Sequence, residues 1–497
     1  MSAAPPVPRA SGVFVWVPLL VVAGALVVMV KRLAEPLTNP DTYFHLRLGE
    51  EFLGGWSPWA PGSVTVYATA DWAPTQWLSQ VLYAVAEDWF GLPGVVWLSG
   101  TVVIAFIVTA AVVAQRFGGA VAGALVTALA VFGCLSFLSA RPQVASYLLV
   151  LLFTASWLRS GRGSRLPWWT VPATWIWAML HGMWVSGILV GLAAALGLTL
   201  DRRGAPAPEG AAPRPALWKV WSVPLLGLAA AGLTVVGPSL YPATSRVGGI
   251  SQYFAEWRAP EFTSPTTATA ALMLALVVLI ALRSEGRQSW LWLMMLSLAA
   301  AWMLYAHRSV PVAVSMLVPL LAASLGSLTP ARPVLSWHTR ALVALGVAAS
   351  AGLACLVPFT SAEQPRHDSP ASAAAGRLPA GTGLLTDWGL GGTDMWLFPD
   401  LDIVMHGYGD MFTDAELARN SDIVDLMPGW DRDLRELKTT HALIPGETPL
   451  AYALVTDHGW QVVAQDPSRR DDESGDGPLT FLVAPDGWLA DAAGSRD

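Results

Sequence analysis

About eleven long apolar runs constrain the fold of this chain more than any other feature of its sequence. A helix needs roughly 20 apolar residues to cross the hydrocarbon of a bilayer, with about 17 as the lower limit. Hydrophobic residues make up 54% of the 497 residues and charged residues only 13%, which is too apolar for a water-soluble protein of this size. The sequence therefore predicts an α-helical polytopic membrane protein with about 11 transmembrane helices, near residues 13–30, 92–114, 118–138, 143–158, 166–181, 184–200, 217–236, 266–282, 288–305, 309–328 and 339–358.

The run over residues 166–200 decides how many times the chain crosses the membrane. Basic residues flank it on both sides, and the positive-inside rule places both flanks in the cytoplasm, so a hairpin broken at His181 is favoured over one overlong helix. With residues 1–12 as a cytoplasmic N-terminus, the inner loops carry 13 basic residues and the longer outer loops carry 7. The sequence thus predicts a membrane domain over 13–358, with a long first outer loop at 31–91, and an exported C-terminus.

The C-terminal part reads as a small extracytoplasmic α/β domain over residues 359–489, followed by a disordered tail at 490–497. From Thr360 onward there are 24 acidic residues against 9 basic ones. Thr413 and Glu416 form a capping box that predicts a helix over 414–426. A second helix is expected over 434–439, and extended segments are expected at 383–388, 401–406, 441–444, 450–458 and 460–465. The glycines of residues 388–392 favour a plain turn over a phosphate-binding loop.

The first outer loop contains the segment Asn39 to Arg47, in which Asn39 is a good N-cap and Pro40 a good first helical residue. A helix starting here places Asp41 and His45 on one face, whereas Arg47 points elsewhere. One interpretation is that Asp41 complements the helix dipole. The other is that it serves as a general base whose orientation or charge is tuned by His45.

Other polar residues are also expected on the outer side. Asp71 precedes a segment, 76–89, that is typical of an interfacial amphipathic helix. Taken singly, each of the remaining outer residues is typical of a snorkelling or interface-belt side chain. Taken together they predict a cationic ring that could hold a lipid phosphate; these residues are Arg141, His181, Glu256, Arg258, His307 and Arg308.

Several signatures are absent from the sequence. None of the expected spans carries an acidic residue in its middle, so the ion relay of coupled transporters is not visible. The sequence has no Walker motif and no metal-ligand spacing such as paired cysteines or HExxH, and residues 13–358 contain no DxD pair. Neither a cofactor nor a nucleic-acid partner is expected.

The pattern resembles the GT-C superfamily of polyprenyl-phosphate-sugar-dependent glycosyltransferases, which have many spans and an acidic residue shortly after the first one. Asp41 occupies that position. The chain also resembles bacterial multispanning proteins of uncertain activity, over the stretches 41–49, 71–78, 180–182, 256–262, 307–311 and 388–396. The second acidic residue that metal-using members of the superfamily carry has no clear counterpart here, so metal-independent chemistry is expected.

The resemblance implies inverting transfer of a sugar from a polyprenyl-phosphate donor to a hydroxyl of an extracytoplasmic glycan or protein, in the bacterial plasma membrane. Asp41 would be the base, and Arg141, Arg258 and Arg308 would stabilise the departing phosphate. His45 and His181 would position or tune these groups. Further substrate contacts are expected from Arg47, Asp71, Glu256 and His307.

Two other functions remain open from the sequence. A non-catalytic partner in envelope assembly could use the acidic C-terminal domain to bind another protein, and the missing second carboxylate favours this. A transporter of lipid-linked glycans would need polar residues that continue through the bundle to the cytoplasmic side, and the spans contain few.

Overall fold

The computed structural model of the chain describes residues 13–161, 163, 165–204, 214–284, 286–328, 336–361, 369–467 and 477–490. The expected cytoplasmic N-terminus at 1–12 lies outside the described residues, as does all but the first residue of the expected tail at 490–497. The chain divides into two compact units. The first comprises Met1–Glu35, Val96–Thr234 and Glu256–Ser361, and the second comprises Pro36–Val95, Val235–Ala255 and Ala362–Asp497.

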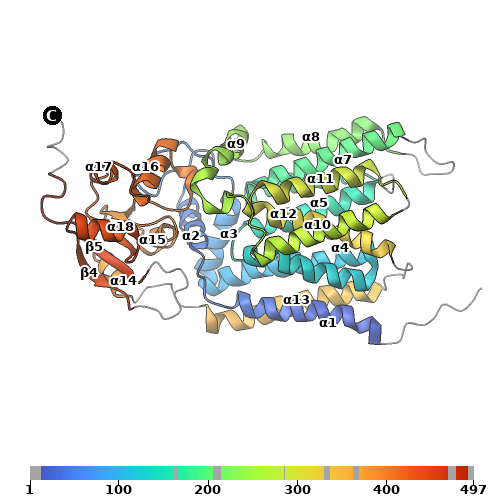
Figure 1. Cartoon of the computed structure of the whole chain (residues 1–497), viewed down its shortest axis with the longest axis horizontal. Helices are drawn as coiled ribbons and strands as arrows, with labels where there is room; N and C mark the ends of the chain where they lie inside the picture. The colour runs from blue at the N-terminus through green and yellow to red at the C-terminus, as the bar shows by residue number, and fades with distance from the viewer. Residues whose placement is uncertain are drawn as a thin grey trace, which may run out of the picture. The chain divides into compact units, whose positions relative to one another are not determined.

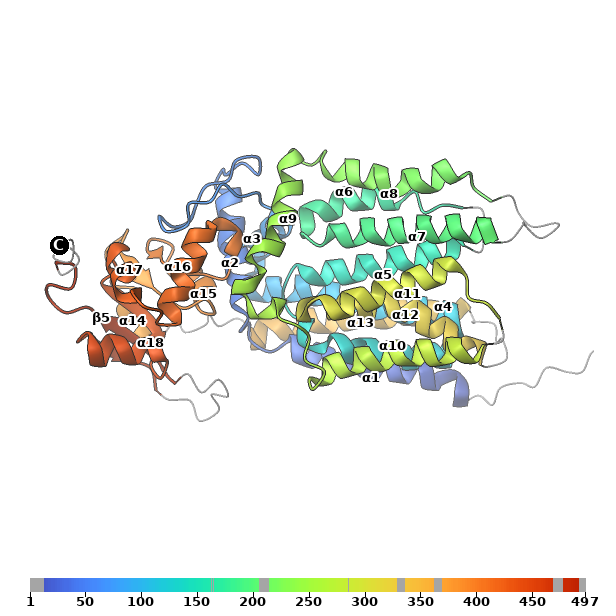
Figure 2. The ribbon, with the colours of Figure 1, turned by 45° about the horizontal axis from the view of Figure 1, so that its top comes forward.

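The first unit is a bundle of helices that lie side by side with nearly aligned axes (Figures 1 and 2). Each expected apolar run overlaps a helix, and two of them share α4, which is interrupted at Gly119 by a left-handed backbone conformation (φ 84°). The helices are α1 (Val13–Leu33), α4 (Leu92–Cys134, whose first residues belong to the second unit), α5 (Gln143–Ser160), α6 (Thr170–Leu180), α7 (Trp184–Gly204), α8 (Leu217–Ala231), α10 (Pro265–Arg283), α11 (Trp290–Tyr305), α12 (Val310–Ser327) and α13 (Ser336–Thr360).

Six helical segments of the described chain are long and apolar enough to cross a membrane, and α6, α8 and α11 are shorter apolar helices. A multi-pass membrane protein is thereby confirmed, whereas the expected number of about eleven crossings is not. The break between α6 and α7 falls at His181, whose backbone is extended, where the sequence predicted a hairpin.

The helices of the first unit differ sharply in burial. In the apolar segment that contains α12, 78% of the residues are buried, and this helix packs against α5, α10 and α11. In the apolar segment of α13 only 22% of the residues are buried. Large apolar side chains are exposed on α13 and α10, for example Val347 and Leu282. So much apolar surface would be costly in water, so these faces require a lipid environment.

Small residues bring α4 and α12 into close contact. A Cβ atom added at Gly326 would lie 2.7 Å from the Cα atom of Gly118, and one added at Gly118 would overlap the carbonyl oxygen of Ala322. Membrane helices pack closely where small residues let their backbones approach.

The second unit is built on a mixed five-stranded sheet with the order β2-β1-β3-β5-β4. β1 pairs in parallel with β2 and β3, whereas β5 pairs antiparallel with β3 and β4. The strands are β1 (Gly383–Leu385), β2 (Asp402–Ile403), β3 (His441–Pro445), β4 (Gln461–Gln465) and β5 (Leu479–Val483).

Helices and short helical turns surround the sheet. The expected extended segment at 450–458 is wrong: it is helical, because Thr448 caps a helix by accepting from the Ala451 amide and Pro449 is its first residue. β5, α14 and α15 were not predicted. The helices are α2 (Pro40–Leu53), α3 (Trp77–Phe90), α9 (Leu240–Ile250), α14 (Pro370–Ala375), α15 (Gly391–Leu397), α16 (Asp414–Val424), α17 (Trp430–Glu436) and α18 (Pro449–Tyr452).

Residues of the first loop form part of the core of this unit. Side chains alternate between the two faces of a strand, and accordingly Leu384 and Leu385 of β1 belong to two different apolar clusters. The cluster that contains Leu384 also contains Phe44 and Leu48 of α2 and Trp72. Residues 31–91 were expected to form a loop of the membrane domain; in the structure, residues 36–95 fold with the C-terminal residues.

Candidate functional site

The start of α2 holds Asp41. Asn39 is the N-cap, its side chain accepting from the Asp41 amide at 3.0 Å, and Pro40 is the first helical residue, as predicted. The half-buried Asp41 carboxylate faces Gly407, where an added Cβ atom would lie 3.6 Å from Asp41 Oδ1. A residue of the first loop and a residue that follows β2 are therefore adjacent.

His45 is buried one turn further along α2. Its Nδ1 atom lies 3.4 Å from Gln80 Nε2 on α3, and its ring packs edge-on against Phe44 and Tyr408. Tyr408 is fully buried, and burial raises the pKa of its hydroxyl above the ordinary value, so the phenol stays neutral. These groups form a polar cluster inside the second unit, one helical turn from Asp41.

Arg47 forms salt bridges along its own helix. Its guanidinium lies 2.6 Å from Glu51 and 3.7 Å from Glu50, which are spaced i,i+4 and i,i+3. The Arg47 guanidinium, which was expected to bind substrate, is therefore already paired with carboxylates of its own helix.

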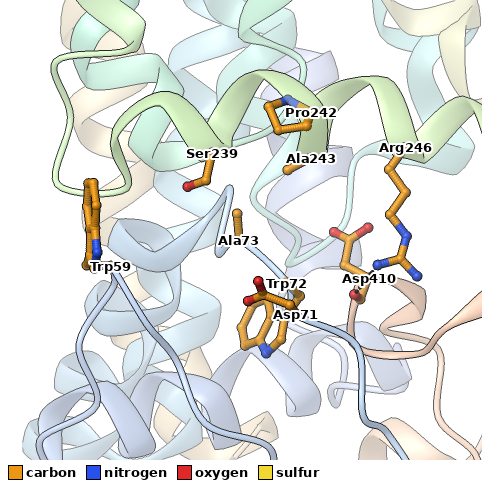
Figure 3. A pocket seen from close by; sticks show the side chains of 9 residues that line it. All are labelled: Trp59, Asp71, Trp72, Ala73, Ser239, Pro242, Ala243, Arg246 and Asp410. Atoms are coloured by element: carbon orange, nitrogen blue, oxygen red, sulfur yellow. Dashed lines mark hydrogen bonds between the residues drawn. The ribbon is translucent and has the colours of Figure 1, made fainter.

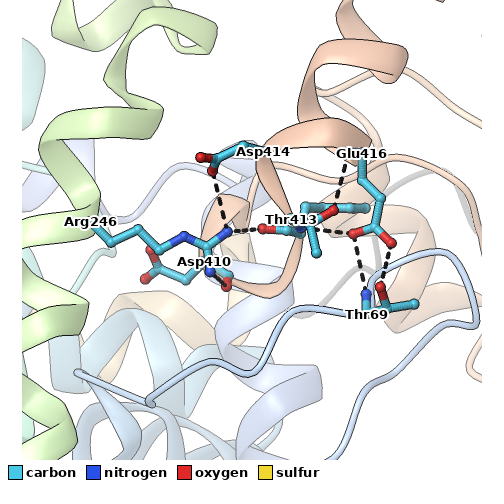
Figure 4. A network of polar contacts seen from close by, with 7 residues as sticks. Thr69, Arg246, Asp410, Thr413, Asp414 and Glu416 are labelled. Atoms are coloured by element: carbon cyan, nitrogen blue, oxygen red, sulfur yellow. Dashed lines mark hydrogen bonds and ion pairs between the residues drawn. The ribbon is translucent and has the colours of Figure 1, made fainter.

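A polar network ties α9 and the first loop to the C-terminal residues of the same unit (Figure 4). Arg246 of α9 donates to the carbonyl oxygens of Phe412 and Asp410. Glu416 accepts from the Thr413 amide in the predicted capping box and from the Thr69 hydroxyl at 2.6 Å. The loop over residues 407–412 is therefore held in place from α9.

In the first unit, two arginines that are far apart in sequence share one carboxylate. Arg141 donates to both Glu256 oxygens, at 2.5 Å to Oε1 and 3.2 Å to Oε2, and Arg308 lies 3.9 Å from Oε2. Arg308 also stacks over the ring of Trp257 at 4.7 Å. The structure therefore brings together three residues of the predicted cationic ring.

Burial alone raises the pKa of Glu256, but the charges of Arg141 and then Arg308 outweigh it and hold the pKa at about 2. Glu256 is thus ionised at neutral pH. Two guanidinium groups and one carboxylate leave a net positive charge, and guanidinium groups bind phosphate oxygens through paired hydrogen bonds.

His181 is buried where α6 ends. Its Nδ1 atom lies 2.9 Å from Ser146 Oγ, which also accepts from Trp177 Nε1. His181 therefore belongs to a buried polar chain between helices rather than to an exposed belt.

His307 and Arg258 lie beside the arginine pair and are connected through their backbones. The His307 amide donates to the Arg258 carbonyl oxygen at 2.9 Å, and the His307 ring packs on Phe137. The Arg258 side chain is exposed.

Asp71 lines a pocket of about 440 Å³ in the second unit. Figure 3 shows Trp59 on one side of this pocket and Arg246 and Asp410 on the other, with Asp71 and Trp72 between them. Ser239, Pro242 and Ala243 complete the lining. Of these residues only Asp71 was a predicted site residue, because the lining comes from three separate segments that share no local pattern.

The glycines after Trp388 allow backbone segments to pack closely against one another. A Cβ atom at Gly391 would overlap the carbonyl oxygen of Met405, and one at Gly392 would lie 2.6 Å from the carbonyl oxygen of Pro40. The seven-residue helix α15 begins here and packs against α2. This favours the interpretation as a turn. Among the described residues, no group of three or more His, Cys, Asp or Glu side chains is arranged to hold a metal ion.

No protein-family model matches the sequence, and no curated protein matches it either. Solved structures do share its fold, and they are membrane glycosyltransferases of the GT-C class.

Two of these enzymes span most of the chain. The oligosaccharyltransferase from Archaeoglobus fulgidus in its apo form is 13% identical, with a TM-score of 0.54, over 88% of this chain and 71% of its own. ArnT from Cupriavidus metallidurans bound to undecaprenyl phosphate is 14% identical, with a TM-score of 0.51, over 95% of this chain and 98% of its own. A further structure of the archaeal enzyme, AglB, holds an inhibitory peptide and a dolichol-phosphate; it is 11% identical, with a TM-score of 0.54, over 88% of this chain and 70% of its own. The predicted GT-C resemblance is confirmed at the level of fold.

Proposed function

We propose that this chain is a membrane glycosyltransferase that moves a sugar from a polyprenyl-phosphate donor to a hydroxyl group of an extracytoplasmic acceptor. The fold likeness to ArnT bound to undecaprenyl phosphate, over nearly the full length of both chains, is the observation that carries this proposal. The archaeal neighbour bound to dolichol-phosphate supports the same donor class.

The donor phosphate is assigned to Arg141 and Arg308. Both guanidinium groups share Glu256, and together with it they carry a net positive charge. As the bond between the anomeric carbon and the phosphate oxygen breaks, negative charge develops on the phosphate, and preorganised cations stabilise that charge. Glu256 prevents the two arginines from repelling each other before the donor binds.

Acceptor activation is assigned to Asp41. Its carboxylate takes the proton of the acceptor hydroxyl while the hydroxyl oxygen attacks the anomeric carbon from the face opposite the phosphate, which inverts the configuration. The polyprenyl phosphate leaves with the electron pair of the broken bond. His45 and Gln80, packed beneath Asp41 in the same unit, hold the helix that presents it.

The replacement of Asp41 by asparagine tests this assignment. A general base contributes about 10²- to 10⁴-fold to rate, so Asp41→Asn should lower sugar transfer by at least 100-fold. The measurement is transfer of radiolabelled sugar by the purified full chain in lipid vesicles, supplied with polyprenyl-phosphate sugars and acceptors extracted from host membranes.

The matched control is Asp433→Asn, which removes a carboxylate from the first turn of α17 and so has a similar effect on a helix dipole. It should transfer sugar at the wild-type rate. Asp41→Asn activity above one tenth of wild type would exclude Asp41 as the base. Absence of transfer by the wild-type chain with every donor fraction would favour the non-catalytic partner.

A further inference from the structure

The pocket lined by Asp71 has a composition suited to a sugar. Its volume of about 440 Å³ lies within the range of about 300–1,000 Å³ typical of small-molecule sites. Two indole rings, two carboxylates and a serine hydroxyl surround it, together with the small apolar surfaces of Ala73, Pro242 and Ala243. All of these residues belong to the second unit.

Each polar group of the pocket has a chemistry that fits sugar hydroxyls. A carboxylate accepts two hydrogen bonds from neighbouring hydroxyl groups without losing its charge. Among the residues that the structure describes, no hydrogen bond or ion pair holds the exposed Asp71 carboxylate, so its oxygens can accept from a ligand. Ser239 Oγ donates to the Val236 carbonyl oxygen at 2.7 Å, which leaves its lone pairs available as acceptors.

Trp59 supplies the apolar surface of the pocket. Its side chain is 66% exposed, although a large indole in a loop gains stability when it is covered. Its ring lies against Gly237, whose backbone is left-handed (φ 68°) and where a Cβ atom would overlap the ring. The loop therefore presents this ring at the edge of the pocket, where it can stack on the C–H face of a sugar.

The charge balance of the pocket excludes an acidic ligand. Among the described residues that line the pocket, Arg246 is the one cation. Its guanidinium already donates to the carbonyl oxygens of Phe412 and Asp410 and lies 3.7 Å from the Asp414 carboxylate. Asp71 and Asp410 would repel a phosphate or a uronic acid, whereas they favour uncharged or amine-bearing rings.

The pocket is also close to the proposed base. Asp410 lines it, and Gly407, three residues earlier in the same segment, faces Asp41 Oδ1. Three residues span at most about 11 Å. Tyr408, between them, packs on Trp72 at 5.4 Å and on Phe44 of the helix that carries Asp41 at 5.1 Å.

We infer that this pocket is the acceptor subsite and that the acceptor is a glycan, bound through a hydroxyl-rich, non-acidic sugar ring that stacks on Trp59 and donates to Asp71 and Asp410. This inference rests on the proposed function for the role of the pocket in transfer, but sugar binding by the pocket can be tested without turnover. Arg246 acts as a positioning residue that fixes the segment carrying Asp410.

The test is saturation-transfer NMR on the full chain in lipid nanodiscs. The probes are neutral di- to tetrasaccharides released from the host envelope by partial acid hydrolysis. Wild type should transfer saturation to sugar ring protons, and Trp59→Ala and Asp71→Asn should each lower this transfer at least fivefold. Trp59→Phe, which keeps an aromatic surface, should retain part of the signal.

Two control variants lie outside the pocket. Trp89→Ala removes an equally exposed tryptophan of the same unit, 71% exposed on α3, and Asp457→Asn removes an exposed carboxylate. Both should bind as wild type does. No saturation transfer to any sugar fraction with wild type, or an undiminished signal from Trp59→Ala, would overturn the inference.

Failure of this inference can be told apart from failure of the proposed function. Asp41→Asn should abolish transfer and keep sugar binding. If Trp59→Ala and Asp71→Asn transfer sugar with an unchanged acceptor KM, the pocket is not the acceptor subsite although the enzyme is a glycosyltransferase. If the wild-type chain binds sugars but transfers none, the pocket binds sugar and its acceptor role is overturned together with the proposed function.

Discussion

Replacement of Glu256 by glutamine separates the structural role of this carboxylate from its effect on the proposed phosphate site. In the wild type, Glu256 joins Arg141 through two hydrogen bonds and lies within ion-pair distance of Arg308. Glutamine keeps the size and one acceptor oxygen but removes the charge. Two guanidinium groups then face each other without a counter-charge.

The size of the stability effect follows from the pKa of Glu256. A fall from the ordinary value of 4.5 to about 2 corresponds to at most about 3–4 kcal/mol, at 1.36 kcal/mol per pH unit. Because 38% of the side chain is exposed, solvent screening reduces this to roughly 1–2 kcal/mol. Glu256→Gln should therefore lower the free energy of unfolding by roughly 1–2 kcal/mol at pH 7.

The pH dependence has a definite sign. A carboxylate whose pKa is lower in the folded than in the unfolded state stabilises fully above the unfolded value and loses this contribution as pH falls through the folded value. The difference in unfolding free energy between wild type and Glu256→Gln should thus be constant above about pH 5.5. It should shrink from about pH 4.5 toward pH 2.

Thermal unfolding of the full chain in nanodiscs at pH 7, 4 and 3 measures this difference in unfolding free energy. Titration with undecaprenyl phosphate measures the effect of the substitution on lipid-phosphate binding. If Glu256 competes with a lipid phosphate for the two arginines, its neutralisation should tighten binding by about fivefold, equivalent to about 1 kcal/mol. A purely structural role predicts that stability and binding fall together. An equal stability difference at pH 7 and pH 3, or weaker lipid-phosphate binding by Glu256→Gln, would refute the reasoning.

Two further substitutions test the second unit. Gly237→Ala should cost about 1–2 kcal/mol of stability for its left-handed backbone, and it should weaken sugar binding in the NMR assay because the new Cβ atom displaces the Trp59 ring. Glu416→Ala should lower the unfolding free energy by about 1–2 kcal/mol, since it removes the acceptor of hydrogen bonds from Thr413 and Thr69; thermal unfolding in nanodiscs measures this loss.

Both substitutions have matched controls in the same unit. Gly459 has a similar left-handed backbone (φ 70°), but a Cβ atom added there would meet no other atom, so Gly459→Ala should cost stability without affecting sugar binding. Glu436 is exposed on α17, and Glu436→Ala should leave stability within about 0.5 kcal/mol of wild type. Equal sugar binding by Gly237→Ala and wild type would contradict the placement of Trp59, and an unchanged unfolding free energy for Glu416→Ala would contradict the network.

The helices of the first unit were predictable because their signal is local. Apolar length alone locates α1, α10 and α13, and the basic flanks of residues 166–200 locate the break at His181. Local capping chemistry likewise located the starts of α2 and α16. Strand β5 was missed because its five residues follow a polar, acidic segment and take their place in the sheet only by pairing with β3 and β4.

The candidate sites also differ in whether a local sequence pattern or contacts between distant residues position them. Asp41 could be singled out because the cap that positions it, Asn39, is two residues away, whereas its neighbour Gly407 lies far along the chain. The sugar pocket depends on Trp59 of the first loop and Arg246 of α9, and the exposed indole has room only because residue 237 is a glycine. No local sequence pattern predicts such a contact, since the residues that make it are far apart in the sequence. A sugar that binds to wild type and fails to bind to Gly237→Ala, with both carboxylates intact, would identify the shape of the pocket rather than its charge as the property that selects the ligand.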